Sequence, residues 1–99
     1  MVILHNEIAT PKGTRHVYVS DIDIQLDIYH QTGEKPPDNA TYVIDYVRYL
    51  PFKVVDGKRI FSEPSYSPPE RIVEGLQIDI IYTIQKYKSY YTVTIKETI

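Results

Sequence analysis

The chain has no cysteine and no tryptophan, and it has one methionine and four glycines among its 99 residues. Without cysteine the protein has no disulfide framework, no thiolate ligand for zinc and no thiol nucleophile. A glycine-rich phosphate-binding loop and the G-x-S-x-G motif of serine hydrolases are also missing from the sequence. These absences favour a protein that is not an enzyme, and they predict no cofactor.

The chain also has no large excess of either charge, since it contains 11 Lys and Arg residues and 13 Asp and Glu residues. Nucleic-acid binding normally relies on basic side chains that neutralise phosphates, so this balance does not favour a nucleic-acid partner. No apolar run approaches the roughly 20 residues of a transmembrane helix, and the first residues lack the basic and apolar regions of a signal peptide. We therefore expect a single domain over residues 1–99 that has no membrane span and is not secreted through a signal peptide.

The sequence is rich in isoleucine, valine and tyrosine, with ten tyrosines in all. These residue types favour strands over helices. The strongest strand pattern covers Leu76–Ile99, where apolar residues alternate with polar ones on either side of Lys88-Ser89. A hairpin that turns at these two residues pairs Ile84 with Val93 and brings both apolar faces to the same side of the sheet.

The N-terminal third predicts two more strands, Val2–Thr10 and Arg15–His30, joined by a three-residue turn at residues 11–13. Along the second strand the apolar positions change parity at Ser20-Asp21. One extra residue restores the alternation to a single face, so this change predicts a β-bulge or a bend.

The three histidines are far apart in this prediction. A three-residue turn pairs His5 with Val19 and Ile8 with His16, which places the two histidines on opposite faces of the hairpin. This arrangement argues against a metal ion shared by His5 and His16, and His30 lies elsewhere. We expect ordinary surface or half-buried histidines.

Three aspartates, Asp21, Asp23 and Asp27, alternate with apolar residues in the second predicted strand. On one strand face they form an acidic stripe, and carboxylates two residues apart can share a hard cation such as Mg²⁺. This pattern gives an alternative hypothesis, a metal-dependent nuclease that uses these three residues. The favoured interpretation is a solvent-facing strand whose acidic side chains discourage edge pairing, because no Lys or His completes a catalytic set.

The segment Asp38–Leu50 has the composition of a strand and the periodicity of a helix. Its apolar residues recur at helical spacing and form one stripe: Ala40, Val43, Ile44, Val47 and Leu50. Asp38 can cap the N-terminus of a helix, and Pro51 can end it. The spacing predicts a helix that packs on the sheet, with a strand as the alternative.

Asp56-Gly57 predicts a tight hairpin over Phe52–Phe61, because both central residues of a type I′ turn need positive φ. Neither face of this hairpin is uniformly apolar, so we expect it to project from the core. Further along the chain, Ser67 and Glu70 fit a capping box and Gly75 fits a C-terminal cap. These residues predict one or two helical turns before Gly75.

Tyrosines and lysines crowd the predicted tip of the last hairpin: Lys86, Tyr87, Lys88, Tyr90 and Tyr91. Tyrosine is frequent at binding surfaces because it offers a large contact area and a hydroxyl group at low conformational cost. We take these five residues as the predicted interaction surface, with the alternative that the tyrosines cover a small core. A base-stacking platform for single-stranded nucleic acid is a further alternative, but the basic residues are too few to favour it.

The segments HVYVSDIDIQLDIYH (residues 16–30) and GLQIDIIYTIQKYKSYY (residues 75–91), with the missing Cys and Trp, carry a family resemblance. The chain resembles small uncharacterised proteins encoded by filamentous viruses of hyperthermophilic archaea, the lipothrixvirus and rudivirus group. This resemblance implies a viral protein in the host cytoplasm or the virion, without an assigned function. It carries no catalytic residue over to this chain.

Together these patterns predict an α+β fold, with an all-β fold as the alternative. A mostly antiparallel sheet has one helix packed on a face and a hairpin that projects. The leading functional hypothesis is a non-catalytic viral protein for protein binding or assembly, which self-associates through a tyrosine-rich or strand-edge surface.

Overall fold

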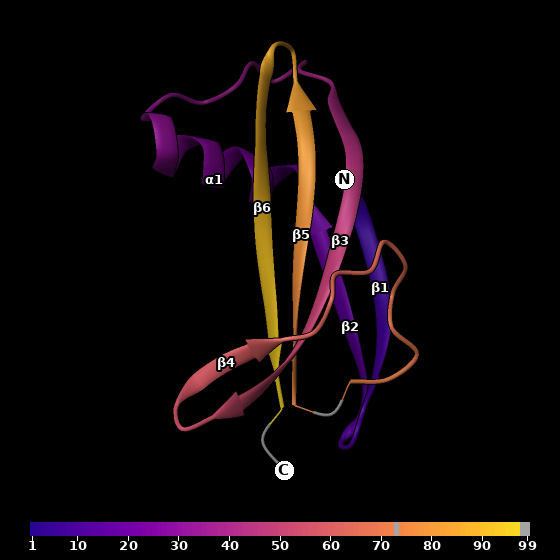
Figure 1. Ribbon diagram of the computed structural model, residues 1–99. Helices are drawn as coiled ribbons and strands as arrows, with labels where there is room; N and C mark the ends of the chain where they lie inside the picture. The colour runs from indigo at the N-terminus through magenta and orange to yellow at the C-terminus, as the bar shows by residue number, and fades with distance from the viewer. Residues whose placement is uncertain (73, 98–99) are drawn as a thin grey trace.

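The computed structural model describes residues 1–72 and 74–97 and consists of two antiparallel sheets and one helix (Figure 1). The elements in chain order are β1 (Val2–Thr10), β2 (Gly13–Ser20), α1 (Asp21–Thr32), β3 (Tyr42–Val55), β4 (Lys58–Phe61), β5 (Gly75–Ile84) and β6 (Tyr87–Lys96). β1 and β2 form a two-stranded sheet, and the other sheet has the strand order β4-β3-β5-β6. This arrangement confirms the predicted α+β fold.

The core lies between the two sheets and beneath α1. In Figure 1 the β1–β2 hairpin and α1 both lie behind the four-stranded sheet, so they cover one face of that sheet. The even-numbered residues of β5, from Leu76 to Ile84, face this layer and are buried. They belong to one cluster with buried residues of the hairpin and the helix: Ile8, Val17, Val19, Ile24 and Ile28. We call this covered side the inner face and the opposite side the outer face.

The C-terminal hairpin is present, but its turn is not where the sequence predicted it. The chain turns at Gln85-Lys86, with a φ of 54° at Gln85, so Ile84 pairs with Tyr87 and not with Val93. Both registers bring the apolar faces to the same side, and alternation alone does not choose between them. The predicted hairpin extended to residues 98 and 99, which lie outside the described residues.

The N-terminal hairpin has a loop one residue shorter than predicted. Thr10 pairs with Gly13, and the Thr10 hydroxyl donates to the Gly13 carbonyl at 2.6 Å and accepts from the Lys12 N–H at 3.2 Å. A register shift of one residue moves every side chain of β2 to the opposite face. The prediction that His5 and His16 lie on opposite faces is therefore wrong, and the two histidines share one face.

Residues 21–32 form helix α1 and not the predicted continuation of a strand. The Ser20 hydroxyl accepts the Asp23 N–H at 3.3 Å, and the Asp23 carboxylate accepts the Ser20 N–H at 2.9 Å. This capping box starts the helix at the position where a bulge or bend was predicted. Ile24 and Ile28, one helical turn apart, are buried, whereas Ile22 is 60% exposed. The sequence alternation in this segment is therefore not the alternation of a strand.

The predicted helix over Asp38–Leu50 is also wrong, because its last nine residues belong to strand β3. The pairing of β3 with β5 shifts between Ile44 and Tyr46, which leaves Asp45 as a bulge. After the bulge the opposite parity faces inward, so Ile44 and Val47 both pack against the core. Two short alternating runs separated by one extra residue imitate helical spacing.

Beyond β5, strand β3 continues into the predicted hairpin with β4, which projects at the lower left of Figure 1. Asp56 and Gly57 have φ values of 51° and 75°, and Phe52 pairs with Phe61 as expected. On this arm Val55 is 52% exposed and Ile60 is 55% exposed. The hairpin therefore stands outside the core.

The short helix predicted before Gly75 is not found in the described residues of this segment, and Val73 lies outside them. Ser65 exchanges two backbone hydrogen bonds with Tyr49 of β3, at 2.7 and 2.8 Å. The Ile72 N–H donates to the Ala9 carbonyl of β1 at 2.9 Å. Because the Ile72 N–H, which lies within the predicted helix, pairs with β1, it is not free to form a helical turn.

Candidate interaction surface

Strand β6 forms one edge of the four-stranded sheet. It pairs with β5 from Lys96↔Gly75 to Tyr87↔Ile84 without a register shift. Within residues 1–72 and 74–97, neither a strand nor a backbone hydrogen bond from a loop reaches its other side. The strand has ten residues and no proline. Such an edge presents an unpaired row of backbone donors and acceptors.

The two-residue turn fixes which backbone groups of β6 face the free edge. In such a hairpin the residues that flank the turn form a hydrogen-bonded pair, and these pairs recur at every second residue. Odd-numbered residues of β6 therefore direct their N–H and C=O groups toward β5, and the Glu97 N–H continues this pattern by donating to the Glu74 carbonyl at 2.7 Å. The even-numbered residues direct theirs outward: Lys88, Tyr90, Thr92, Thr94 and Lys96.

All five residues of the predicted interaction surface lie on this edge strand or its turn. Lys86 is in the turn, and the other four lie on β6. They are divided between the two faces of the sheet, because Tyr87 and Tyr91 pack against the core whereas Tyr90 is 59% exposed on the outer face. Lys88 is also exposed and has the parity of Tyr90. The sequence prediction found the strand but placed these residues at its tip.

On the inner face, helix α1 is tied to β6 through Gln31. The Tyr87 hydroxyl and the Ser89 hydroxyl donate to Gln31 Oε1 at 3.1 and 3.3 Å, and Gln31 Nε2 donates to Asp27 Oδ2 at 2.8 Å. Burial under the helix raises the pKa of Tyr91, and the negative charges of neighbouring aspartates raise it further. Burial also raises the pKa of Asp27. The helix thus holds β6 from the inner face and leaves its backbone edge free.

On the outer face, the buried carboxylate of Asp79 holds three strands together. Asp79 is 2% exposed and accepts hydrogen bonds from Arg48 at 2.7 Å, Thr92 at 2.9 Å and Gln77 at 3.0 Å. Burial acts to raise the pKa of Asp79, but these hydrogen bonds outweigh it and hold the pKa below its ordinary value. This residue was not predicted from the sequence, although an aspartate within the apolar run of β5 is a signal for a paired buried charge.

The three aspartates of the nuclease hypothesis lie on α1 and have separate partners. Asp21 accepts from the N-terminal amine at 2.8 Å, which lowers the pKa of its carboxyl group, while Asp23 caps the helix and Asp27 accepts from Gln31. Their ligand atoms do not form a common group in the described part of the chain. The strand face on which this hypothesis depended does not exist.

Comparisons with protein-family models, curated proteins and solved structures gave no match for this chain. No helix within the described ranges has the length and apolar character that crossing a bilayer requires.

Proposed function

We propose that this protein is a non-catalytic assembly protein that self-associates by pairing β6 of one copy with β6 of a second copy. The observation that supports this most is the regular ten-residue edge of β6, which has no partner on its outer side in residues 1–72 and 74–97. A strand that adds to such an edge makes main-chain hydrogen bonds along its whole length. The resemblance to proteins of archaeal filamentous viruses adds the host cytoplasm or the virion as the setting.

The edges of β1, β3 and β4 are less suited to strand addition. The loop between β4 and β5 covers part of the β3 edge through Ser65 and part of the β1 edge through Ile72. β4 has four residues, so it offers a short edge. β6 is long and regularly paired, and none of the described residues covers its free edge.

The geometry of β6 restricts how two copies can pair. An antiparallel pair related by a two-fold axis perpendicular to the sheet keeps the inner faces of both copies on the same side. This requires odd-numbered residues to face odd-numbered ones and even-numbered residues to face even-numbered ones. A register centred on Tyr90 satisfies the rule and places Lys88 opposite Thr92, so no two lysines of β6 face each other.

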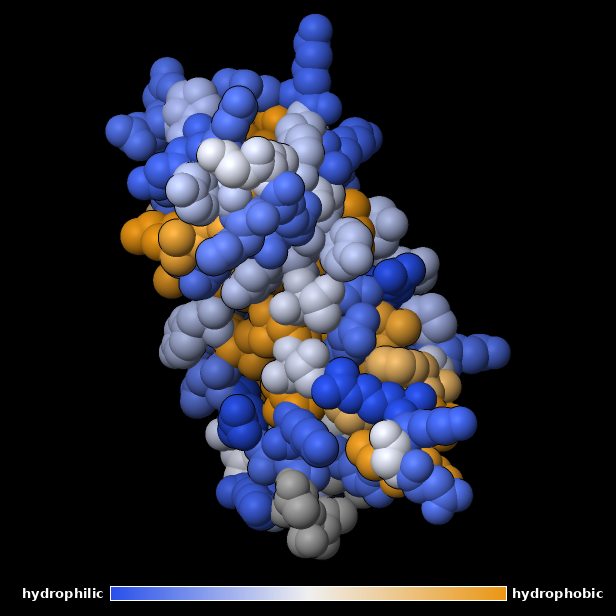
Figure 2. Space-filling view, turned by 90° about the vertical axis from the view of Figure 1, so that its left-hand side faces the viewer, coloured by the Kyte–Doolittle hydropathy of each residue, from blue (hydrophilic) through white to orange (hydrophobic). Residues whose placement is uncertain are grey.

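The side of the molecule that carries β6 and α1 has the surface expected for such a contact. Figure 2, which views the left-hand side of Figure 1, shows hydrophobic surface in the centre of this side between polar areas. Exposed apolar surface on this side of the molecule favours a second copy over solvent as the neighbour.

The test uses a matched pair of variants at Tyr90, whose N–H points to the free edge. Wild-type protein is expected to show a concentration-dependent dimer in analytical ultracentrifugation. Tyr90→Pro removes the outward N–H and should give a folded monomer, because proline is tolerated at an edge position that makes no ladder bond. Tyr90→Thr retains the N–H and should still dimerise.

Circular dichroism checks that both variants keep the wild-type content of strand. A wild-type protein that remains monomeric at high concentration would overturn the proposal. Equal dimerisation of wild type and Tyr90→Pro would exclude β6 as the contact and would point to another surface.

A further inference from the structure

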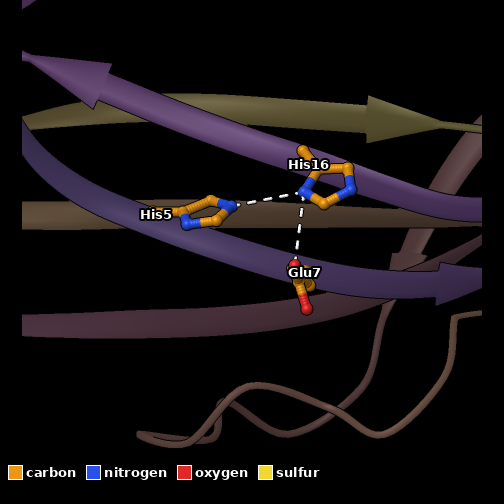
Figure 3. Close-up of side chains that lie close together, drawn as sticks. All are labelled: His5, Glu7 and His16. Atoms are coloured by element: carbon orange, nitrogen blue, oxygen red, sulfur yellow. Dashed lines mark hydrogen bonds and ion pairs between the residues drawn. The ribbon is translucent and has the colours of Figure 1, made fainter.

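Three metal-ligating side chains gather on the exposed face of the β1–β2 hairpin, away from β6. Glu7 of β1 pairs directly with His16 of β2, and His5 lies two residues before Glu7 on the same face. Figure 3 shows the two imidazole rings directed toward each other, with the Glu7 carboxylate beside His16. One ligand atom from each residue lies within 4.8 Å of the others. The short loop at Thr10 produces this juxtaposition by setting the register.

Two of the three distances between these ligand atoms match those around a tetrahedral metal ion. His5 Nε2 lies 3.3 Å from His16 Nδ1, and His16 Nδ1 lies 3.5 Å from a carboxylate oxygen of Glu7. Nitrogen and oxygen ligands bind zinc at about 2.0–2.2 Å, so two of them at the tetrahedral angle are about 3.3–3.6 Å apart. Both observed distances fall within the range expected between two ligands of a tetrahedral zinc ion.

The types of ligand indicate which class of metal ion the site would bind. Two imidazoles and one carboxylate suit Zn²⁺ and its first-row neighbours, whereas Mg²⁺ prefers a shell of oxygen ligands. Three protein ligands leave a further coordination position open to water or to an external ligand. All three side chains are exposed, so a metal ion reaches them directly from solvent.

Tyr18 supports the site from the neighbouring position on β2. Its ring stacks on His5 with the ring centroids 4.3 Å apart and an angle of 7° between the planes. This contact restricts the orientation of the His5 ring before a metal ion binds, which reduces the entropy that binding costs. Tyr18 is therefore a positioning residue and not a ligand.

From this geometry we propose that His5, Glu7 and His16 form a binding site for a divalent transition metal ion of the zinc class. Without a metal ion, the same residues form an imidazole hydrogen bond and an ion pair that depends on protonation of His16. A metal site binds one equivalent of metal ion, whereas a cluster that forms only the hydrogen bond and the ion pair binds none. Metal titration distinguishes these two cases.

The experiment titrates ZnCl₂ into the tag-free 99-residue chain by isothermal calorimetry in a buffer that does not chelate metals. Wild type is expected to bind one equivalent of Zn²⁺ and to give no heat with MgCl₂. His16→Asn removes one ligand and should weaken Zn²⁺ binding by at least about 10- to 100-fold, since loss of even an outer-shell partner has effects of that size. Glu7→Gln should weaken binding in the same direction.

His30→Asn is the matched control, because His30 is an exposed histidine on α1 outside this cluster. It should bind Zn²⁺ as wild type does. A wild type that gives no Zn²⁺ heat would overturn the proposal. A His16→Asn variant that binds as tightly as wild type would also overturn it, because the binding would then come from other residues. Thermal unfolding of each variant without metal shows whether the hairpin is intact, and the zinc-induced rise in melting temperature gives a second readout.

Discussion

Arg48 on β3 and Asp79 on β5 lie directly opposite each other, and the guanidinium donates from Nη2 to the buried carboxylate at 2.7 Å. The Asp79 carboxylate is nearly inaccessible to water, whereas the Arg48 side chain is 40% exposed. The pair therefore places a buried negative charge under a cation that still contacts solvent. Thr92 of the edge strand donates to the same carboxylate, so this charge also holds β6 in register.

Removal of Arg48 should destabilise the fold. Arg48→Met leaves Asp79 buried without its cationic partner, and a hydrogen bond to a charged group contributes about 1.5–3 kcal/mol. We expect the free energy of unfolding, measured with urea, to fall by about that amount. Lys53→Met on the exposed arm is the control and should change it by less than about 0.5 kcal/mol. Equal effects of the two variants would mean that the pair contributes nothing specific.

The lowered pKa of Asp79 predicts how stability depends on pH. The folded-state pKa lies below the unfolded value of about 3.9, so the contribution of the carboxylate is fully present above that value. It is lost as the pH falls through the lower folded-state pKa. The difference in unfolding free energy between wild type and Asp79→Asn should therefore shrink below about pH 4. Denaturant melts at pH 7 and at successively lower pH measure this difference, and a constant difference would contradict the predicted shift.

Gly75 has no room for a side chain. A Cβ atom at this position would lie 2.2 Å from the Phe52 ring, which packs over it from β3. Gly75→Ala should therefore destabilise the protein by about 1–3 kcal/mol through overpacking. The double variant Gly75→Ala with Phe52→Leu should lose less than the sum of the two single variants, because the smaller side chain relieves the clash. Strict additivity in thermal or urea unfolding would show that the two residues do not interact.

The sequence was sufficient for the fold class and for most strands, but not for the two places where alternation is interrupted. At Ser20 the change of parity predicts a bulge or a bend, and the structure has the start of a helix. Around Asp45 the apolar spacing predicts a helix, with a strand as the alternative, and the structure has a strand with a bulge. A β-bulge and the start of a helix both move the apolar residues to the other parity. The apolar pattern alone therefore does not distinguish a bulge from a helix. The capping box of Ser20 and Asp23 was the local signal that could have done so.

The predicted interaction residues show a second kind of limit. Alternation fixes which parity of β6 faces inward but leaves the register free in steps of two residues. The turn was therefore placed at Lys88-Ser89 when it lies at Gln85-Lys86. At the N-terminal hairpin the error was a single residue in loop length, and it hid the cluster of His5, Glu7 and His16. Register between strands depends on turn geometry, which a single sequence with few glycines specifies weakly.

Two adjacent tyrosines test the register of β6 directly. Tyr91 has inward parity and packs against the core, whereas Tyr90 has outward parity and is 59% exposed. Tyr91→Ser should lower the free energy of unfolding by about 2–4 kcal/mol, because it removes a large side chain from beneath α1. Tyr90→Ser should lower it by about 0.5 kcal/mol, since it loses only contacts across the open face. Because self-association at β6 also contributes to stability, both variants are compared at concentrations where ultracentrifugation shows monomer. Similar losses for the two variants, or a larger loss for Tyr90→Ser, would mean that the strand is turned over and that its inner face carries the even-numbered residues.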